Sequence, residues 1–503
     1  MSKTIQMGFN RVEGDLEVKA TIDNGVVTDA WMIGTMYRGI ERMMTGRGSL
    51  DGLVITPRVC GICSTSHLLA AARALENLSG AAVAHNGRLI RHLVLAVEKL
   101  QSDVRHVFLM FAVDLANEKY SDQPLYAEAV KRFQPFSGTS VIEVIQASRK
   151  LPEIIAILGG QWPHSSFVVP GGITSEPSES DLRQCLMLLK EFYRWYENRV
   201  LGCSVERWQQ VSTPAQLDSW LEESDSHRNG DLGFLIRCCR EYGLTTMGQG
   251  HGSFLAVPEH GSLGIKSAGA VSGGFISNEQ NTGFAEEQVS EQLRYCHYNE
   301  SVKDGHPLEN GAPPRFIDDS EKYSWAKAPR YNGQPAETGP LAELMVNGDP
   351  LFQALVEEQG SSVLVRELAR ITRPARLLPL MEQWCGDVDM KAPFYQSAGE
   401  IVEGEGGGLV QAPRGFLGHW LQLSGGRIEH YQIISPTTWN GSPRDDQSVR
   451  GPIEEALIGT PVADPDNPVE IGHVVRSFDL CMVCSVHSVS KNGHTLSRLR
   501  LGA

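Results

Sequence analysis

Two Cys-x-x-Cys pairs lie near opposite ends of this chain of 503 residues. The first pair is Cys60 and Cys63 in "RVCGIC", and the second is Cys481 and Cys484 in "DLCMVC". Neither pair completes a metal site alone, because two thiolates leave coordination positions open. Together they offer four thiolates, which suit zinc, an iron–sulfur cluster or another soft metal. If both pairs bind one centre, the chain has to fold so that its two ends meet in a buried site between lobes.

Two other interpretations of the cysteine pairs remain open. A structural zinc ribbon usually closes over a loop of roughly 15 to 20 residues, whereas almost the whole chain separates Cys63 from Cys481. A redox-active dithiol needs only one pair, and this chain has two. The spacing therefore favours a four-thiolate metal site without identifying the metal.

The residues after the first pair predict a turn followed by a helix. Gly61 allows the backbone to turn sharply beneath two sulfurs, and the following "STSHLLAAARALENL" is rich in Ala and Leu and lacks Gly and Pro. The N-terminal amides of a helix favour negative charge, so they help to keep thiolates deprotonated. The other cysteines lack ligand-like spacing and are predicted to be ordinary thiols: Cys185, Cys203, Cys238, Cys239, Cys296 and Cys385.

Length and charge restrict the class of protein. A chain of 503 residues exceeds what one hydrophobic core usually supports, and 41% hydrophobic residues is typical of a globular protein. The formal net charge of −15 disfavours nucleic acid or an anionic membrane surface as the main partner. No apolar run approaches the roughly 18 to 20 residues that span a bilayer, and the first residues do not resemble a secretory signal. We therefore expect a cytoplasmic protein that associates with a membrane only through partners.

Several segments of the sequence resemble the large, catalytic subunits of nickel–iron hydrogenases. "RVCGIC", followed by His67, is similar to the N-terminal Arg-x-Cys-Gly-x-Cys motif of that family, and "DLCMVCSVH" to its C-terminal Asp-Pro-Cys-x-x-Cys-x-x-His motif. Further matches follow the family's order along nearly the whole chain: "RVEG", "YRGIE", "WPHSSFVVPGGI", "KYSWAKAPRYNGQPAETGPLAEL", "APRGFLGHW" and "YQIISPTTWNGSPRDD".

Four residues depart from the family's pattern. Leu480 replaces the usual Pro before the last cysteine pair, and Gln411 replaces the usual Glu before the Pro-Arg-Gly stretch. Asp15 replaces the His after "RVEG", and Thr437 replaces a Ser near the metals. These changes do not alter the class, and they suggest a divergent branch such as the actinobacterial-type uptake enzymes.

The resemblance implies a nickel–iron centre whose iron has carbonyl and cyanide ligands. The four paired cysteines would bind nickel, and Cys63 and Cys484 would also bridge to the iron. Arg414, in "APRG", matches the arginine that lies over the metals, and Thr437 would offer its hydroxyl to a cyanide. Soft thiolates suit such a centre because they stabilise variable oxidation states of nickel.

Heterolytic cleavage of dihydrogen releases a proton that needs a base. By family position, Cys484 would accept this proton first, and Glu13, in "RVEG", would relay it outward. A carboxylate beside a metal thiol suits this task because burial can raise its pKa towards the working range. Without the resemblance, Glu13 would be interpreted as a solvated strand residue.

The resemblance also implies a second, redox-inert cation, usually Mg²⁺. Its ligands would be the Glu41 and His487 side chains and the backbone carbonyl of Ile433. Mg²⁺ prefers oxygen ligands and retains water, so an imidazole among them is unusual. The matching segments contain further candidates for the surroundings of the metals: His67, Asp103, His106 and His164.

Local patterns and the resemblance together predict a mixed α+β fold, mainly helical, with a central helix bundle and small peripheral sheets. The first residues alternate polar and apolar, with "DNG" as a hairpin turn, and long helical patterns follow. The predicted segments are a β-rich segment (1–56), a helical core with the first cysteine pair (57–204), a peripheral lobe (205–320), an α/β region with the second pair (321–487) and a tail (488–503).

The leading hypothesis for function is the catalytic subunit of a nickel–iron hydrogenase that oxidises dihydrogen. The chain has no further cysteine set for iron–sulfur clusters, so electrons must leave through an iron–sulfur small subunit in an obligate heterodimer, or in a dimer of heterodimers. The resemblance also implies nickel-insertion factors and a maturation protease that cuts after His487. The alternatives are a hydrogen-sensing regulatory subunit and a non-catalytic subunit of a respiratory redox complex, whose relatives typically lack the four cysteines.

Overall fold

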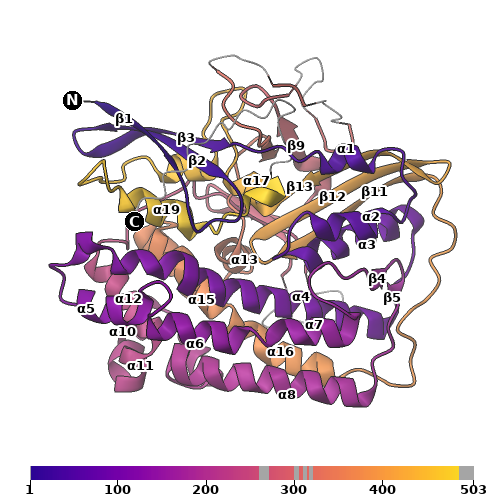
Figure 1. The fold of residues 1–503 in the computed structure, drawn as a ribbon, viewed down its shortest axis with the longest axis horizontal. Coiled ribbons are helices and arrows are strands. Elements are labelled where there is room, and N and C mark those ends of the chain that lie inside the picture. Colours follow the sequence, from indigo (N-terminus) through magenta and orange to yellow (C-terminus); the bar gives the residue numbers. More distant parts are fainter. Residues whose placement is uncertain (1, 260–270, 299–304, 310–313, 317–320, 486–503) are drawn as a thin grey trace.

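The computed structural model describes residues 2–259, 271–298, 305–309, 314–316 and 321–485, and it is mainly helical (Figure 1). Long helices fill the lower half of that view, and the sheets at the two ends of the chain lie above them. The predicted α+β fold with a helix bundle and small sheets is confirmed.

The bundle is built around α4 (His85–Arg105), which is buried along nearly all of its length. Buried charges need partners, and those of α4 tie it to its neighbours: Arg91 lies 2.7 Å from Glu76, and Asp103 lies 2.6 Å from Arg373. The helices packed against α4 are α3 (Ser64–Ser79), α6 (Thr139–Ser148), α7 (Leu151–Gly159), α15 (Val363–Thr372) and α16 (Pro374–Gly386).

An antiparallel sheet of β11 (Gly404–Ala412), β12 (Gly415–Ser424) and β13 (Arg427–Ile434) lies directly against α3. The glycine run of β11 permits this close approach. A side-chain carbon at Gly408 would lie 1.9 Å from the carbonyl oxygen of Ala70, so no larger residue fits there. As a result, the turn between β11 and β12 is held near the N-terminal end of α3.

The N-terminal sheet contains β1 (Lys3–Gly8), β2 (Leu16–Asp23) and β3 (Val26–Gly34) in that order. Side chains of β2 alternate between buried and half-buried, as expected for a strand with one face on the core. Asn24 and Gly25 both have positive φ, which the tight hairpin turn requires. The predicted "DNG" turn is therefore confirmed.

The two ends of the chain meet on one core. The largest cluster of buried hydrophobic residues includes Leu16 of β2 as well as Cys484. The loop after β1 also pairs with the segment that joins α19 (Val469–Ser477) to α20 (Met482–Ser485), through a parallel β-bridge between Glu13 and Cys481. The fold therefore brings both cysteine pairs to the same place.

Small sheets and further helices complete the described structure. The other sheets are β4 (Val168–Val169) with β5 (Gly172–Ile173), β6 (Phe254–Ala256) with β7 (Gly274–Ser277) and β8 (Gln280–Thr282), and β9 (Val289–Gln292) with β10 (Ala328–Tyr331). The other helices are α1 (Ile40–Met44), α2 (Gly52–Ile55), α5 (Tyr126–Phe133), α8 (Glu179–Trp195), α9 (Val205–Trp208), α10 (Pro214–Glu223), α11 (Asp225–Asn229), α12 (Asp231–Glu241), α13 (Pro340–Val346), α14 (Pro350–Gln359), α17 (Pro436–Asn440) and α18 (Pro452–Ala456). The boundaries of the predicted segments remain a proposal, and the tail (488–503) lies outside the described residues.

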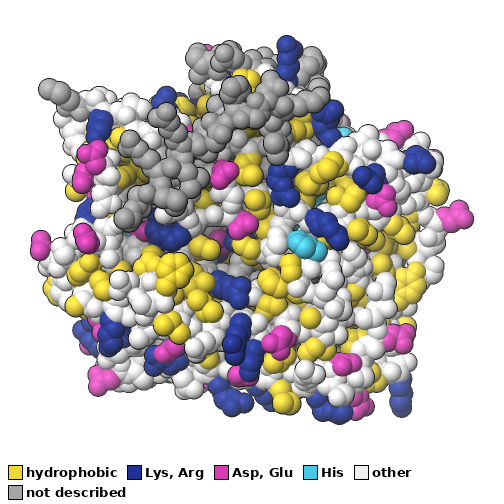
Figure 2. Space-filling view, viewed as in Figure 1, with side chains coloured by type: hydrophobic (Ala, Val, Ile, Leu, Met, Phe, Trp, Pro, Cys, Tyr) yellow, Lys and Arg dark blue, Asp and Glu magenta, His cyan; other side chains and the backbone are white. Residues whose placement is uncertain are grey.

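The face shown in Figure 2 mixes charges of both signs. Positive and negative side chains are interspersed over it, with small groups of hydrophobic side chains between them. Among the helices of the described residues, none combines the length and the apolar character needed to cross a membrane.

Candidate metal centre and active site

The four paired cysteines form one buried cluster. Their Sγ atoms all lie within 4.8 Å of one another. Three of the Sγ–Sγ separations are 3.1 Å between Cys481 and Cys484, 3.3 Å between Cys63 and Cys484, and 3.5 Å between Cys60 and Cys481. None of the described cysteines is in a disulfide. The structure thus brings the two pairs together as their spacing suggested, and the sulfurs are close enough to share one soft-metal centre.

The first pair is positioned by the N-terminal end of α3, where Cys63 is the residue before the first helical turn. The Glu98 carboxylate of α4 accepts hydrogen bonds from the backbone N–H groups of Thr65 (2.7 Å) and Ser66 (3.0 Å) in this first turn. Burial raises the pKa of Glu98 to about 7, although these donors oppose the shift. The predicted turn and helix after the first pair are confirmed, and α4 fixes their position.

The second pair is positioned by the loop after β1. The backbone N–H of Met482 donates to the carbonyl oxygen of Glu13 over 2.6 Å. Gly14 follows with φ of +85°, and a side-chain carbon there would lie 2.9 Å from the backbone nitrogen of Val483. The glycine of "RVEG" is therefore required for the close approach between this loop and the second cysteine pair.

Thr437, at the start of α17, connects to the same pair. Its hydroxyl oxygen accepts the backbone N–H of Cys481 over 2.8 Å. The residue also lines a small cavity together with Cys63, Cys481 and Cys484. Because the oxygen is an acceptor in this bond, the hydroxyl hydrogen remains available to donate into the cavity.

The charge on the sulfurs indicates what the cluster can bind. Burial raises the pKa of Cys484, whereas hydrogen bonds from Cys481 and Cys484 hold the pKa of Cys60 well below its ordinary value. Four buried thiolates would place several negative charges in the interior, which is costly without a cation. A metal ion provides that cation, so the donor set fits a soft, thiolate-bound metal.

Arg414 lies in the turn between β11 and β12 and lines the cavity of the cysteine cluster. Its Nε donates to Asp479 over 3.0 Å, and its Nη1 has no hydrogen-bond partner among the described residues. Asp479 also lies 3.0 Å from Nδ1 of His106 and 3.1 Å from Nη1 of Arg370. Although burial opposes ionisation, these cations hold the pKa of Asp479 well below its ordinary value. Asp479 thereby fixes Arg414 beside the sulfurs.

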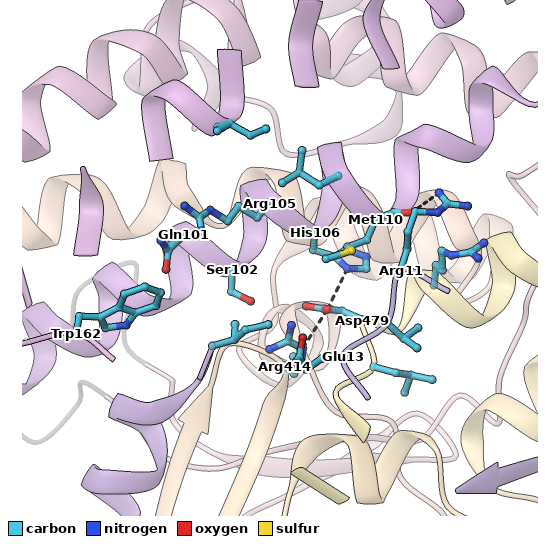
Figure 3. Close-up of a pocket in the computed structure, with 16 residues that line it drawn as sticks. Arg11, Glu13, Gln101, Ser102, Arg105, His106, Met110, Trp162, Arg414 and Asp479 are labelled. Carbon is cyan, nitrogen blue, oxygen red and sulfur yellow. Dashed lines mark hydrogen bonds and ion pairs between the residues drawn. The ribbon is translucent and has the colours of Figure 1, made fainter. Parts of the chain in front are cut away.

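Glu13 and Arg414 both line a pocket of about 370 Å³. Figure 3 shows Glu13 and Arg414 next to each other at this wall, near Asp479. Burial raises the pKa of Glu13, and the charge on Cys60 raises it further, whereas Arg414 and Arg38 lower it. Arg414 lines both this pocket and the cysteine cavity, whereas Glu13 lines the pocket and pairs through its backbone with Cys481.

The structure brings together Glu41 and Ile433, two of the residues implied for a second cation. The Glu41 carboxylate accepts the backbone N–H of Ile433 over 3.0 Å. The third implied ligand, His487, lies outside the described residues.

Three polar residues that sequence reasoning missed lie in the surroundings of Glu41. Glu291 is fully buried, 3.2 Å from Nζ of Lys327 and 3.1 Å from Nε2 of Gln432. Burial raises the pKa of Glu291 to about 7, and the charge on Glu41 contributes to this shift. Both carboxylates therefore lie in one partly buried polar region, and no local pattern in the sequence indicates their pairing.

The other candidates from the sequence have structural partners. Asp103 binds Arg373 through both carboxylate oxygens, at 2.6 and 2.8 Å. Nδ1 of His164 lies 2.8 Å from the carbonyl oxygen of Pro57, just before the first cysteine pair. Among the four candidates, His67 lines the cysteine cavity itself.

Asp479 and Glu98 also help to position the site, and Nε2 of His419 lies 2.9 Å from Nδ1 of His67. The sequence reasoning gave these three residues no role. Asp479 and His419 could have been identified from the sequence, because they lie in two segments that resemble motifs of the family, "DLCMVCSVH" and "APRGFLGHW". Glu98 is one acid in a helical pattern, and nothing in its neighbourhood distinguishes it from an exposed residue.

The structure also explains one departure from the family's pattern. Gln411 accepts the backbone N–H of Val257 over 3.1 Å and donates to Glu343 over 3.1 Å. An amide satisfies both partners, whereas an ionised carboxylate could not donate to Glu343.

Comparisons with known proteins agree with this geometry. The family model for nickel-dependent hydrogenase matches residues 38–134 and 136–487. The chain is 29% identical to the periplasmic NiFeSe hydrogenase large subunit of Desulfomicrobium baculatum, over 95% of this chain and 93% of the relative. It is 26% identical to the uptake hydrogenase large subunit of Rhizobium leguminosarum bv. viciae, over 98% and 96%.

The fold agrees as well. An H2-activated NiFeSe hydrogenase from Dm. baculatum matches with a TM-score of 0.82 and 28% identity, over 97% of this chain and 100% of that one. The matching family model includes both cysteine pairs and Arg414. Because the model spans most of the sequence and the four sulfurs meet as one site, the chain belongs to the nickel-dependent hydrogenase family, as a large subunit.

Proposed function

We propose that this subunit catalyses the heterolytic cleavage of dihydrogen, in the oxidising direction, and passes the electrons to an iron–sulfur small subunit. The observation that carries this proposal is the cluster of four buried sulfurs, all within 4.8 Å, beside an arginine nitrogen without a partner among the described residues. The relatives are hydrogenases, including an uptake hydrogenase, which supports the same reaction and direction.

The four cysteines would hold the metals. Cys60 and Cys481 would bind nickel, and Cys63 and Cys484 would bind nickel and bridge to an iron with carbonyl and cyanide ligands. When bound, this group supplies the Lewis-acid and redox chemistry that splits dihydrogen. Thr437 would donate its hydroxyl hydrogen to a cyanide, since its oxygen already accepts the N–H of Cys481.

The chain's own residues would handle the proton. Cys484 would take it first, and Glu13 would accept it next and deliver it to the adjacent pocket. The β-bridge between Glu13 and Cys481 supports this order, because it holds the carboxylate beside the second cysteine pair. Arg414, fixed by Asp479, would orient the substrate with its free Nη1 and exclude water from the sulfurs.

A second cation would stabilise the end of the chain. Glu41, the carbonyl of Ile433 and His487 would bind Mg²⁺, and the buried Glu291 adds negative charge nearby. Glu41→Gln should therefore lower the magnesium content of the purified enzyme, whereas the same change at the half-buried Glu17 of β2 should leave it unchanged. Equal magnesium in both variants would contradict this site.

Partners follow from the chemistry of the centre. Apart from the two pairs, the sequence offers no cysteine set for iron–sulfur clusters, so electrons must pass to a small subunit, in a heterodimer or a dimer of heterodimers. Nickel-insertion factors would load the site, and a protease would then remove the tail after His487. Intact mass spectrometry of active enzyme tests this last step: a subunit that still ends at Ala503 would contradict it.

Location and alternatives are proposed on the same basis. We place the subunit in the cytoplasm, attached to a membrane through partners at most; the Dm. baculatum relative is named as periplasmic. A hydrogen-sensing subunit would keep the same centre and signal through a partner. A non-catalytic respiratory subunit has no use for the assembled sulfur cluster and is disfavoured.

Metal analysis with infrared spectroscopy tests the proposed function most directly. The purified heterodimer should contain nickel and iron in comparable amounts and show carbonyl and cyanide bands, and it should oxidise dihydrogen with an artificial electron acceptor. Zinc in place of nickel, or the absence of these bands, would overturn the proposal. Full infrared bands with negligible turnover would favour the sensor.

A further inference from the structure

The Asp114 carboxylate is shared by two arginines that come from opposite ends of the chain. One of its oxygens pairs with Nη2 of Arg11, in the loop after β1, and the other pairs with Nη1 of Arg476, in the last turn of α19. Asp114 lies in a short 3₁₀-helix (Ala112–Ala116) and is only 5% exposed. A single buried acid therefore connects the N-terminal and C-terminal segments.

Both arginines also bind backbone close to the loop of Glu13. Nη1 of Arg11 donates to the carbonyl oxygen of Met110 over 2.9 Å. Nη2 of Arg476 donates to the backbone and side-chain oxygens of Asn10, over 3.2 and 2.8 Å. Arg11 and Glu13 line the same pocket (Figure 3). The contacts to the two arginines thus hold the residues that directly precede Glu13.

The backbone of Arg11 has a conformation that the loop would not adopt without such contacts. Its φ is +56°, in the left-handed region that residues with a side chain rarely occupy. Strained conformations of this kind persist only where the surrounding structure imposes them. Because Arg11 is two residues before Glu13, the path of the chain through Glu13 depends on the contacts of Arg11, including its pair with Asp114.

The charge on Asp114 is essential to this arrangement. Although burial opposes ionisation, Arg476 and Arg11 lower the pKa of Asp114 below its ordinary value, so it is a carboxylate near neutral pH. Hydrogen bonds between ionised partners are about twice as strong as those between neutral groups. Without the negative charge, two guanidinium groups would meet in a mainly buried place and repel each other, which would push the loop away from α19.

We propose that Asp114 is a positioning residue for proton transfer, which holds the loop of Glu13 in register with the segment of Cys481. The β-bridge between Glu13 and Cys481 joins the same two segments that Arg11 and Arg476 bring to Asp114. A misplacement on the order of 1 Å at a reacting group can cost about 100-fold in rate. This inference rests on the proposed function, because it assumes that Glu13 accepts the proton.

The variant Asp114→Asn in the purified heterodimer tests this role, because it keeps the shape of the side chain and removes its charge. We expect wild-type nickel content and infrared bands, with turnover in dihydrogen oxidation lowered roughly 10- to 100-fold. The KM for dihydrogen should stay unchanged, and turnover should be more sensitive to D2O than in the wild type, because proton transfer then limits the rate. Isotope exchange between dihydrogen and water, which needs no electron transfer, should fall with turnover.

A double variant with Glu13→Gln distinguishes positioning from a general loss of structure. If Asp114 acts through Glu13, the double variant should exchange isotopes no more slowly than Glu13→Gln alone. A general structural defect would instead slow the exchange of Glu13→Gln further, by the same factor as in the single variant Asp114→Asn.

Asp231→Asn is the matched control. Asp231 is 3% exposed and accepts hydrogen bonds from Arg132 (3.0 Å) and Ser140 (2.7 Å), so it is also a buried acid with two donors. Its replacement should lower the melting temperature and leave turnover and isotope exchange unchanged.

Gly472→Ala keeps the test decisive if Asp114→Asn fails to assemble. A side-chain carbon at Gly472 would lie 2.6 Å from Nη1 of Arg476, so this guanidinium has to shift at its contact with Asp114 while every charge remains. We expect slower isotope exchange in this variant too, again without a further effect in the Glu13→Gln background.

The outcomes separate this inference from the proposed function. Missing carbonyl and cyanide bands in the wild type overturn the proposed function, and undiminished exchange in Glu13→Gln overturns its proton route together with the positioning role. If the bands are present and Glu13→Gln slows exchange, the positioning role alone is overturned by unchanged exchange in Asp114→Asn, or by a loss that persists in full in the double variant. Loss of nickel in both Asp114→Asn and Gly472→Ala also overturns it, because the carboxylate is then needed for assembly. Slower exchange in these two variants that Asp231→Asn does not show, and that disappears in the Glu13→Gln background, supports it.

Discussion

Glu13 and Cys481 pair through their backbones as a parallel β-bridge, although they lie at opposite ends of the chain. The proposed proton acceptor and a proposed nickel ligand are therefore parts of one hydrogen-bonded structure. Movement of one residue relative to the other would break the 2.6 Å hydrogen bond from Met482 to Glu13. This rigidity suits proton transfer, which requires the carboxylate to stay within hydrogen-bond reach of its donor.

Replacing a cysteine of the cluster should abolish both metal binding and activity. Cys481→Ser exchanges a soft, ionisable sulfur for a hard oxygen that is poorly ionised near neutral pH. We expect nickel to be lost and dihydrogen oxidation to fall below detection. Cys385→Ser, at a half-buried cysteine of α16 outside the cluster, should retain both. Elemental analysis and activity measurements decide, and an active Cys481→Ser enzyme would contradict the assignment.

Replacing Glu13 should slow proton transfer while the centre still assembles. Glu13→Gln keeps the shape but cannot accept a proton, so turnover should fall by roughly 10²- to 10⁴-fold. Isotope exchange between dihydrogen and water should fall with it, whereas nickel content and infrared bands stay unchanged. The control is Glu17→Gln. In the wild type, Glu17 lies on β2 and its carboxylate accepts a hydrogen bond from the side-chain amide of Gln6. Undiminished exchange in Glu13→Gln would mean that protons leave by another route.

The buried Glu98 should make stability depend on pH. Burial raises its pKa from an ordinary value of 4.5 to about 7, so between these values the folded chain holds a proton that the unfolded chain has lost. Stability therefore falls as pH rises through this window. Glu98→Gln does not titrate, so between about pH 5 and pH 7 the melting temperature of the wild type should fall more steeply with rising pH than that of the variant. Parallel melting curves against pH for the two proteins would refute the raised pKa.

The hydroxyl of Thr437 should have two separable effects. Thr437→Val keeps the shape but leaves the buried N–H of Cys481 without its acceptor, at a cost of about 1–3 kcal/mol in stability. Its cyanide bands should also shift, because the proposed donor is lost. Thr437→Ser keeps the hydroxyl and should resemble the wild type in melting temperature and spectrum. Unchanged cyanide bands in Thr437→Val would show that the hydroxyl does not reach a cyanide.

Local sequence patterns predicted the elements that depend on neighbouring residues. The sequence "DNG" predicted the hairpin turn because Asn and Gly adopt positive φ more readily than most residues, and Asn24 and Gly25 both have positive φ. The helix after Cys63 follows from its Ala and Leu content. The meeting of the two cysteine pairs followed from their spacing, because neither pair could complete a site alone.

Pairings between distant segments could not be predicted from the sequence. Nothing in the local sequence distinguishes Glu98 and Arg91 from charged residues on the exposed face of a helix. They are buried because α4 packs against α3, whose Thr65 and Glu76 are their respective hydrogen-bond partners. Similarly, the hydrogen bonds that join His67 to Tyr431 through His419 depend on β11 lying close to α3, which places β12 and β13 beyond it. Local periodicity indicates which face of a helix is apolar, but it does not indicate which distant residue satisfies a charge.

The sulfur cluster also has a consequence for how the chain is held together. Cys63 and Cys484 are 421 positions apart, so a metal that binds both closes nearly the whole polypeptide into a loop. Cross-links over long loops restrict the unfolded ensemble most, by an amount on the order of 5 kcal/mol. The catalytic metals would thus link two segments that are far apart in the sequence. The centre could not be completed before Cys484 has been synthesised and its segment has packed against the first cysteine pair.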